Sequence, residues 1–141
     1  MLDKLNEYYE KGLLRKQEHP ILDLTVWNYT PEVQYGRLWD EITMLCRGLV
    51  TNSEGEIVGR GFRKFFNYEE YGEGGFDPKL IPNEPFEVYE KMDGMLIILF
   101  YYKDTWVVAS RGSFISDASI KARELLGKYH LALLDKTKTY A

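Results

Sequence analysis

Apolar residues recur along the chain with two periods, and each period predicts a different kind of element. Four of them are spaced as on one face of a helix near the N-terminus: Leu2, Leu5, Tyr9 and Leu13. This spacing predicts a helix over residues 2–17. The β-branched and aromatic run at 21–29 predicts a strand. Thr30 followed by Pro31 indicates a turn or the start of a short helix, because Thr caps helices and Pro suits the first helical position.

Two hairpins are predicted further along the chain. Residues 46–51 and 56–62 are apolar runs on either side of a cluster of turn residues, and residues 95–102 and 105–110 flank a two-residue Lys-Asp turn. A helix should follow, capped by Ser116 or the aspartate after it. The last residues are polar and become β-prone at Thr139 and Tyr140.

Between the hairpins lies a long segment with two parts. Residues 68–85 contain several Gly and Pro breaks and predict a long loop. Residues 85–90 predict a strand that ends next to Lys91, and Asp93-Gly94 predicts a sharp turn, because glycine tolerates positive φ. The turn would hold the Lys91 amine at the mouth of a strand, where it could act as a nucleophile. A plain hairpin whose turn begins with lysine fits the tetrapeptide equally well.

Together these elements predict an α+β fold, a mostly antiparallel sheet with flanking helices. The 141 residues suffice for one domain or less, and 15% aromatic residues favour a sheet-rich body. The longest apolar run, 95–102, is too short to span a bilayer, and the charged N-terminus does not resemble a signal peptide. We therefore expect a cytoplasmic protein with no membrane partner. Cys46 is the single cysteine, which excludes an internal disulfide.

Charge and aromatic content point to one candidate surface. The net charge is −4, so any contact with nucleic acid must come from a local patch. Residues 62–67 combine two cations with three aromatic residues, which suits a nucleotide pocket. The same run also fits an aromatic core edge with surface cations, and Arg47 by itself fits a solvated strand residue. No His, Cys or carboxylate set has metal-ligand spacing, so no metal site is predicted, and there is no Ser/His/Asp set or P-loop.

Four runs, read in order, resemble the RNA ligase family of the covalent nucleotidyltransferases, and most closely its bacteriophage-type RNA ligase 1 branch. The runs are residues 46–50, 63–67, 89–95 and 110–113. One Lys-x-Asp-Gly is a weak signal, but four runs in the family's order and spacing are a strong one. The resemblance covers about residues 20–141. It implies that the chain, 1–141, is the N-terminal part of an adenylation domain of the nucleotidyltransferase (ATP-grasp-like ligase) type.

The resemblance also implies a reaction. Lys91 matches the nucleophile that attacks the α-phosphorus of ATP, forming lysyl-AMP and releasing pyrophosphate, and only an uncharged amine can attack. Mg²⁺ would neutralise the phosphates. The AMP would then pass to an RNA 5′-phosphate, which a 3′-hydroxyl attacks to join the ends. RNA ends are therefore the implied partners, in RNA repair.

The resemblance assigns further residues to the nucleotide. Arg47 and Lys64 match cations that meet its phosphates, and Phe66 matches an aromatic residue of its pocket. Asp93-Gly94 matches the turn that approaches the ribose, and Glu90 matches a residue that reads the adenine amino edge in some relatives. Arg111 stands where the family pattern has Lys. An arginine keeps the charge but binds in a planar fork and does not deprotonate, so its role differs.

One departure from the family limits the expected activity. The family continues with a Phe-Glu strand, a Glu-bearing strand and a Lys-x-Lys run, and none is present in these residues. We expect the chain to be inactive or very weak unless a second chain completes it. A split polypeptide, a frame-interrupted gene and a deliberate truncation would each explain the missing runs. Two other functions stay open: a non-catalytic nucleotide- or RNA-binding remnant, and a relative that acts on DNA or on GTP.

Overall fold

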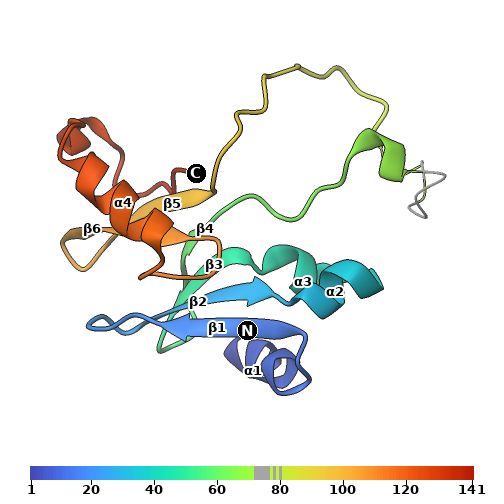
Figure 1. Cartoon of the computed structure of the whole chain (residues 1–141), viewed down its shortest axis with the longest axis horizontal. Coiled ribbons are helices and arrows are strands. Elements are labelled where there is room, and N and C mark those ends of the chain that lie inside the picture. The colour runs from blue at the N-terminus through green and yellow to red at the C-terminus, as the bar shows by residue number, and fades with distance from the viewer. Residues whose placement is uncertain (72–76, 78, 80) are drawn as a thin grey trace. The chain divides into compact units, whose positions relative to one another are not determined.

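The computed structural model describes residues 1–71, 77, 79 and 81–141. They divide into a main unit, Met1–Lys64 with Met95–Ala141, and a second unit, Phe65–Gly94 (Figure 1). The glycines and Pro78 that predicted a loop after residue 71 lie outside the described residues.

The main unit is built around a four-stranded antiparallel sheet. Its strands occur in the order of the sequence: β1 (Leu14–Glu18), β2 (Leu24–Tyr29), β3 (Arg47–Asn52) and β4 (Ile57–Arg60). Neighbours in sequence are neighbours in space, so short turns suffice to connect most of them. The predicted hairpin of β3 and β4 is confirmed.

The N-terminal helix is shorter than predicted. Helix α1 (Leu2–Glu10) ends before Gly12, which has φ +73 and cannot continue a right-handed helix. The prediction of helix to residue 17 was therefore wrong, and β1 occupies residues 14–18 instead. Strand β1 is mostly polar, so its own sequence signal is weak; its backbone pairs with β2, from Leu14 opposite Tyr29 to Glu18 opposite Thr25.

Two short helices connect β2 to β3. Helix α2 (Pro31–Gly36) begins as predicted, with the Thr30 hydroxyl accepting from the Val33 N–H. Helix α3 (Glu41–Leu45) begins at Asp40, whose carboxylate accepts from the N–H groups of Ile42 and Thr43. The Thr43 hydroxyl accepts in return from the Asp40 N–H, which completes a capping box.

A second hairpin and a helix complete the main unit. Strands β5 (Ile97–Tyr102) and β6 (Thr105–Ser110) pair antiparallel across a turn at Lys103 and Asp104, whose φ angles are +43 and +63. Both angles are positive, as a tight two-residue hairpin turn requires. Helix α4 (Asp117–Leu126), capped by Ser116, and the 3₁₀ turn η3 (Leu131–Leu133) follow. Tyr140 then pairs with Leu99 of β5, at the position predicted to be β-prone.

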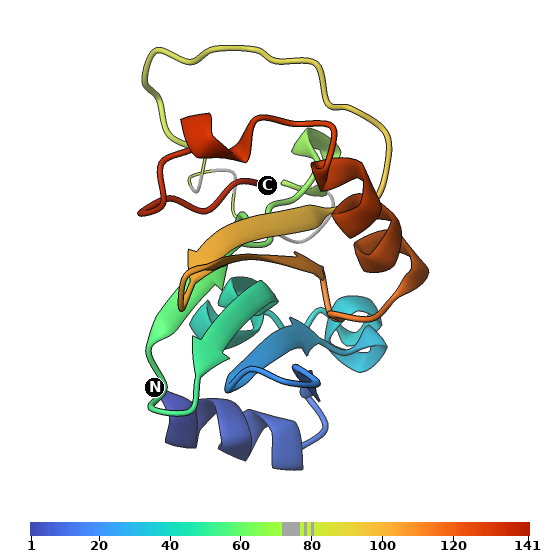
Figure 2. The same ribbon diagram turned by 90° about the vertical axis from the view of Figure 1, so that its left-hand side faces the viewer.

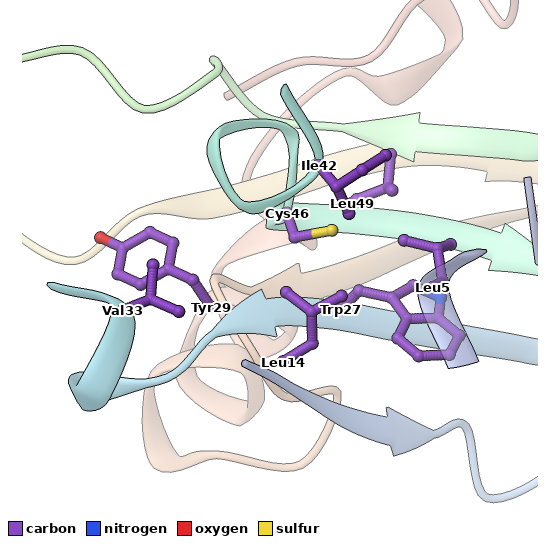
Figure 3. Close-up of a cluster of buried hydrophobic side chains, with 8 residues drawn as sticks. All are labelled: Leu5, Leu14, Trp27, Tyr29, Val33, Ile42, Cys46 and Leu49. Carbon is purple, nitrogen blue, oxygen red and sulfur yellow. The ribbon is translucent and has the colours of Figure 1, made fainter. Parts of the chain in front are cut away.

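Both faces of the four-stranded sheet are buried, which gives the main unit three layers. On one face Trp27 and Leu49 pack with Leu5 of α1 and with residues of α2 and α3 (Figure 3). On the other face Val26 and Val50 pack against β5 and β6. Figure 2 shows the β5–β6 hairpin and α1 on opposite sides of the sheet. The predicted α+β class with mostly antiparallel sheets is confirmed.

The second unit contains little regular structure among its described residues. A 3₁₀ turn, η1 (Tyr68–Glu70), is capped by Asn67. The prediction of a strand at 85–90 was wrong: these residues are exposed and form neither helix nor strand, and Asp93-Gly94 forms a bend instead of a tight turn. Pro85 offers no N–H, and an exposed strand without a partner leaves its backbone groups unpaired, so the apolar alternation alone does not create one.

No helix among the described residues has the length and apolar content that crossing a membrane demands.

We predict that Gly48→Ala destabilises the protein more than Gly12→Ala does. Both glycines have positive φ, +81 and +73, so both substitutions strain the backbone. A Cβ at Gly48 would also overlap Ile98 Cδ1, whereas no atom lies within 4 Å of one at Gly12. Urea unfolding should show a loss of about 1–3 kcal/mol for Gly48→Ala. Equal losses for the two variants would contradict a close contact at Gly48.

We also predict that acidification below about pH 6.5 weakens the fold through His19. Its Nδ1 accepts from the N–H groups of Ile21 and Leu22 at 3.2 and 3.0 Å, and its ring packs edge-on against Phe114. Burial, and then the charge of Arg123, lower the pKa of His19 from 6.5. Below pH 6.5, His19 binds a proton more readily in the unfolded chain than in the folded protein, because folding lowers its pKa. The free energy of unfolding therefore decreases as the pH is lowered.

The measurement is the melting temperature at about pH 7.5 and about pH 5.5. His19→Asn is the matched variant, because its side-chain oxygen can accept the same hydrogen bonds without titrating. The wild-type chain should lose more stability than the variant over this interval. Equal losses would show that His19 does not cause the pH dependence.

Candidate functional site

The Arg47-Gly48 dipeptide forms a β-bulge at the start of β3. The ladder passes from Trp27 opposite Leu49 to Asn28 opposite Arg47, so Gly48 is an extra residue without a partner on β2. Its φ of +81 is open to glycine and strained for other residues. A bulge bends its strand and turns the neighbouring side chain out of the regular alternation. The dipeptide therefore sets the direction of the half-buried Arg47.

The Arg111-Gly112 dipeptide packs directly against this bulge. A Cβ at Gly48 would lie 3.6 Å from both Cα and O of Arg111. A Cβ at Gly112 would lie 3.3 Å from Cβ of Asn28, the residue opposite Arg47. The two Arg-Gly runs, 64 positions apart in the sequence, thus lie next to each other, and Ile98 Cδ1 occupies the space that a Cβ at Gly48 would need.

The Arg111 side chain lies over a buried aromatic ring. Its Cζ is 5.4 Å from the centre of the Tyr29 ring, and Nη1 donates a long hydrogen bond of 3.5 Å to the Tyr29 hydroxyl. Tyr29 is held at the end of β2, where its N–H donates to the Cys46 carbonyl at 2.9 Å. A guanidinium over a ring face is attracted by the negative charge of that face.

Lys64 lies over a second ring, which is in contact with Tyr29. Its backbone N–H donates to the Met44 carbonyl of α3 at 2.8 Å, and its Nζ is 5.5 Å from the centre of the Trp39 ring. Trp39 in turn packs edge-on against Tyr29, with ring centres 4.9 Å apart at 86°. Arg111, Tyr29, Trp39 and Lys64 therefore form a continuous series of contacts.

Helix α3 supports the Trp39 and Lys64 end of this series. Asp40, the residue after Trp39, caps the helix and also accepts a hydrogen bond of 2.8 Å from the Tyr8 hydroxyl. Burial raises the pKa of Asp40, but the hydrogen bonds from Thr43, Tyr8 and Ile42 outweigh it and lower the pKa overall. Asp40 thus remains a carboxylate at neutral pH and keeps the helix start, and Trp39 with it, in place.

Cys46 lies beside Arg47, but its burial makes the thiol a poor nucleophile. It is buried in the core between α3 and the sheet (Figure 3). Burial, and to a lesser extent the charge of Asp40, raise the pKa of its thiol to about 12. The thiolate, which is the reactive form, is therefore scarce at neutral pH.

A second cationic feature of the main unit is an open hollow of about 600 Å³ beside β4. It is lined by Arg60 and Arg63 on one side and by Lys138 with its threonine neighbours on the other. Cations on two segments thus face a common space large enough for a phosphate-bearing ligand. Sequence reasoning included Arg63 in a motif but did not anticipate Arg60 or Lys138.

The other predicted site residues belong to the second unit. Phe66 is half-buried and packs edge-on against Tyr71, with ring centres 6.4 Å apart. Glu90, Lys91 and Asp93 are exposed, and Gly94 has φ +148. The structure therefore groups Arg47, Lys64 and Arg111 in one unit and the residues around Lys91 in the other.

The described side chains of the protein do not form a ready binding site for a metal ion. Within residues 1–71, 77, 79 and 81–141, no three His, Cys, Asp or Glu side chains gather closely enough to hold a metal ion. Mg²⁺ is commonly bound through the phosphates of a ligand with one or two carboxylates, which does not need such a cluster.

Comparison with known proteins decides the family. A family model described as RNA ligase matches residues 45–140, which is more than half of the chain. The chain belongs to the RNA ligase family of the bacteriophage RNA ligase 1 type. The resemblance seen in the four sequence runs is thereby confirmed. The matched residues include Arg47, Lys64 and Arg111 as well as the whole of the second unit.

A viral relative of this RNA ligase family agrees with the match. The chain is 35% identical over 102 residues to a protein of Autographa californica nuclear polyhedrosis virus, whose name assigns it polynucleotide kinase and RNA ligase activities. The match covers 67% of this chain and 14% of the length of the viral protein. The chain therefore corresponds to a small part of that RNA ligase relative.

Sequence reasoning missed three residues that lie among these cations. Tyr29 and Trp39 connect the cations, and Asn28 lies between the two Arg-Gly runs with a buried Oδ1 that has no hydrogen-bond partner in the part of the chain that the structure describes. The available signal was aromatic residues shortly before the Cys-Arg-Gly run. That signal does not reveal which rings meet, because the contacts depend on the bulge and on α3.

We predict that Asp40→Ala lowers stability by about 1–2 kcal/mol, because it removes the cap of α3 and the partner of Tyr8. Asp40→Asn should cost less, since an amide oxygen can still cap the helix. Chemical unfolding of both variants checks this order. If the two variants lose the same amount, the charge of Asp40 matters and its capping role does not.

Proposed function

We propose that the chain is the nucleophile-bearing part of an ATP-dependent RNA ligase, in a partial nucleotidyltransferase adenylation domain. The observation that carries the proposal is the grouping of Arg47, Lys64 and Arg111 around two packed Arg-Gly runs in a chain of the RNA ligase family. Three cations gathered by backbone contacts and rings suit a ligand with several negative charges. ATP is the ligand that the family implies.

Lys91 is the proposed nucleophile. Its uncharged Nζ attacks the α-phosphorus of ATP, a bond forms between Nζ and phosphorus, and the bond to the bridging oxygen breaks. Pyrophosphate leaves with the electron pair, and the amine loses its remaining extra proton to solvent. Lys91 is exposed on the second unit, so the amine is accessible to solvent.

Each remaining residue has a role within this proposal. Arg47 and Lys64 bind the phosphates, and Arg111 adds a planar donor for their oxygens. In the second unit, Phe66 stacks on the base, and Glu90 binds the adenine amino group. Asp93 and Gly94 approach the ribose, because glycine leaves the backbone accessible there.

RNA ends are the proposed second substrate. AMP would pass from Lys91 to an RNA 5′-phosphate, and a 3′-hydroxyl would then attack that phosphate and release AMP. The hollow formed by Arg60, Arg63 and Lys138 offers cations for the RNA backbone. Mg²⁺ accompanies ATP and neutralises charge on its phosphates.

A non-catalytic nucleotide-binding role is the second candidate. It is favoured by one observation: the residues whose contacts lead from Arg111 to Lys64 all belong to the main unit. Such a chain would bind ATP without forming lysyl-AMP. The experiment below separates the two candidates.

We predict that radiolabel from α-labelled ATP attaches to Lys91 when the chain is incubated with Mg²⁺ and a polypeptide that carries the family's later Glu and Lys-x-Lys segments. Lys91→Ala should abolish the label, because it removes the attacking amine. Peptide mapping by mass spectrometry should place one AMP on Lys91. The chain alone should give little or no label.

Lys79→Ala is the matched control, because Lys79 is another exposed lysine of the second unit. It should label like the wild-type chain. Absence of label in every sample, with ATP still bound, would favour the non-catalytic candidate. Label that survives Lys91→Ala would show that another residue is the nucleophile.

A further inference from the structure

Two of the three clustered cations, Arg111 and Lys64, each lie over an aromatic ring. Arg111 lies over the Tyr29 ring, Lys64 lies over the Trp39 ring, and the two rings contact each other edge-on. We call Tyr29 and Trp39 the aromatic bridge. Neither residue belongs to a run that carries the resemblance to RNA ligases, so the resemblance assigns them no role.

The burial of Tyr29 decides what the aromatic bridge can do. Its side chain is only 5% exposed, so its ring cannot serve as a stacking platform for a nucleobase. It is fixed by the backbone pairing of β2 with β1 and by the bond from its N–H to Cys46. A fixed, buried ring with a cation on its accessible side supports that cation and does not contact a ligand.

Trp39 and Lys64 are held by opposite ends of α3. Trp39 directly precedes the cap residue Asp40, and the Lys64 N–H is bonded to the carbonyl of Met44 in the last turn. Although the Lys64 backbone is bonded near the far end of this five-residue helix, its Nζ lies 5.5 Å from the centre of the Trp39 ring.

We propose that Tyr29 and Trp39 are positioning residues that hold the Arg111 guanidinium and the Lys64 ammonium as a pair for a polyphosphate. This inference rests on the proposed function, which supplies the nucleotide, and adds residues that act through the cations. Arginine and lysine have much rotamer freedom to lose on binding. A ring that restricts this freedom beforehand reduces the loss and strengthens the binding of an anion.

The pair also sets a preference among anions. Two cations held on separate rings can bind two phosphate groups of the same polyphosphate ligand at once. ATP and inorganic tripolyphosphate should therefore bind through both cations, whereas AMP and orthophosphate reach only one. The expected order of affinity places the two polyphosphates above the two monophosphates at the same ionic strength.

The test is isothermal titration calorimetry of the full chain with inorganic tripolyphosphate and with ATP at fixed salt. Tyr29→Leu and Trp39→Leu should each weaken binding by about two- to fivefold, as expected for the loss of one cation–ring contact. Tyr29→Phe keeps the ring and should bind nearly as the wild type does. Tyr101→Leu removes the ring under Lys136, 4.3 Å from its Nζ and outside the bridge, and should change nothing.

Double variants show whether each ring acts through its cation. Tyr29→Leu should have no further effect on binding in an Arg111→Ala background, and Trp39→Leu none in a Lys64→Ala background. If a ring only stabilised the fold, its substitution by leucine would weaken binding as much in the alanine background as in the wild-type chain. That result would overturn the proposal. If Tyr29→Leu fails to fold, the cycle of Trp39 with Lys64 decides, because Trp39 is only partly buried.

The outcomes separate this inference from the proposed function. If the ring variants bind tripolyphosphate as tightly as the wild type while Lys91 takes up label from ATP, the positioning role of the aromatic bridge is wrong and the ligase proposal stands. If the double variants show the expected dependence but Lys91 is never labelled, the positioning role is right and the proposed ligase chemistry is wrong. A wild-type chain that binds neither polyphosphate overturns the bridge.

Discussion

The close packing at Gly48 is the constraint on which the rest of the main unit depends. The bulge at this glycine lets the end of β6 approach β3 until Arg111 lies against it, with Ile98 filling the space that a side chain would need. Gly112 makes the reciprocal contact with Asn28. Through these contacts the hairpin covers one face of the sheet and two distant Arg-Gly runs become neighbours.

The same contact explains how an acidic chain presents a cationic surface. The net charge of −4 is spread over the whole sequence, but the fold gathers arginine and lysine near the start of β3. Ring faces, supplied by Tyr29 and Trp39, stabilise these cations without neutralising their charge. The carboxylate of Asp40 accepts hydrogen bonds from the start of α3 and from Tyr8, so it stabilises the helix next to Trp39.

Local chemistry made much of this structure predictable. Thr30 and Ser116 cap helices, and Lys103-Asp104 turns a hairpin, because each depends on only a few neighbouring residues. The polar strand β1 was not predictable, since its pairing with β2 comes from a distant segment. The prediction of a strand at 85–90 was wrong because these residues alternate as in a strand but have no partner strand among the described residues. The cations of the site were found through their motifs, but the rings between them follow only from the tertiary fold.

The most direct test of the account is nuclear magnetic resonance of the chain labelled with ¹⁵N at arginine, titrated with ATP. The account predicts that the side-chain Nε–H signals of Arg47 and Arg111 shift together, with one shared dependence on ATP concentration. Arg15, exposed on β1, provides the reference and should not shift. Signals of Arg47 and Arg111 that stay unchanged, or that move no more than that of Arg15, would contradict a nucleotide site at the packed Arg-Gly runs.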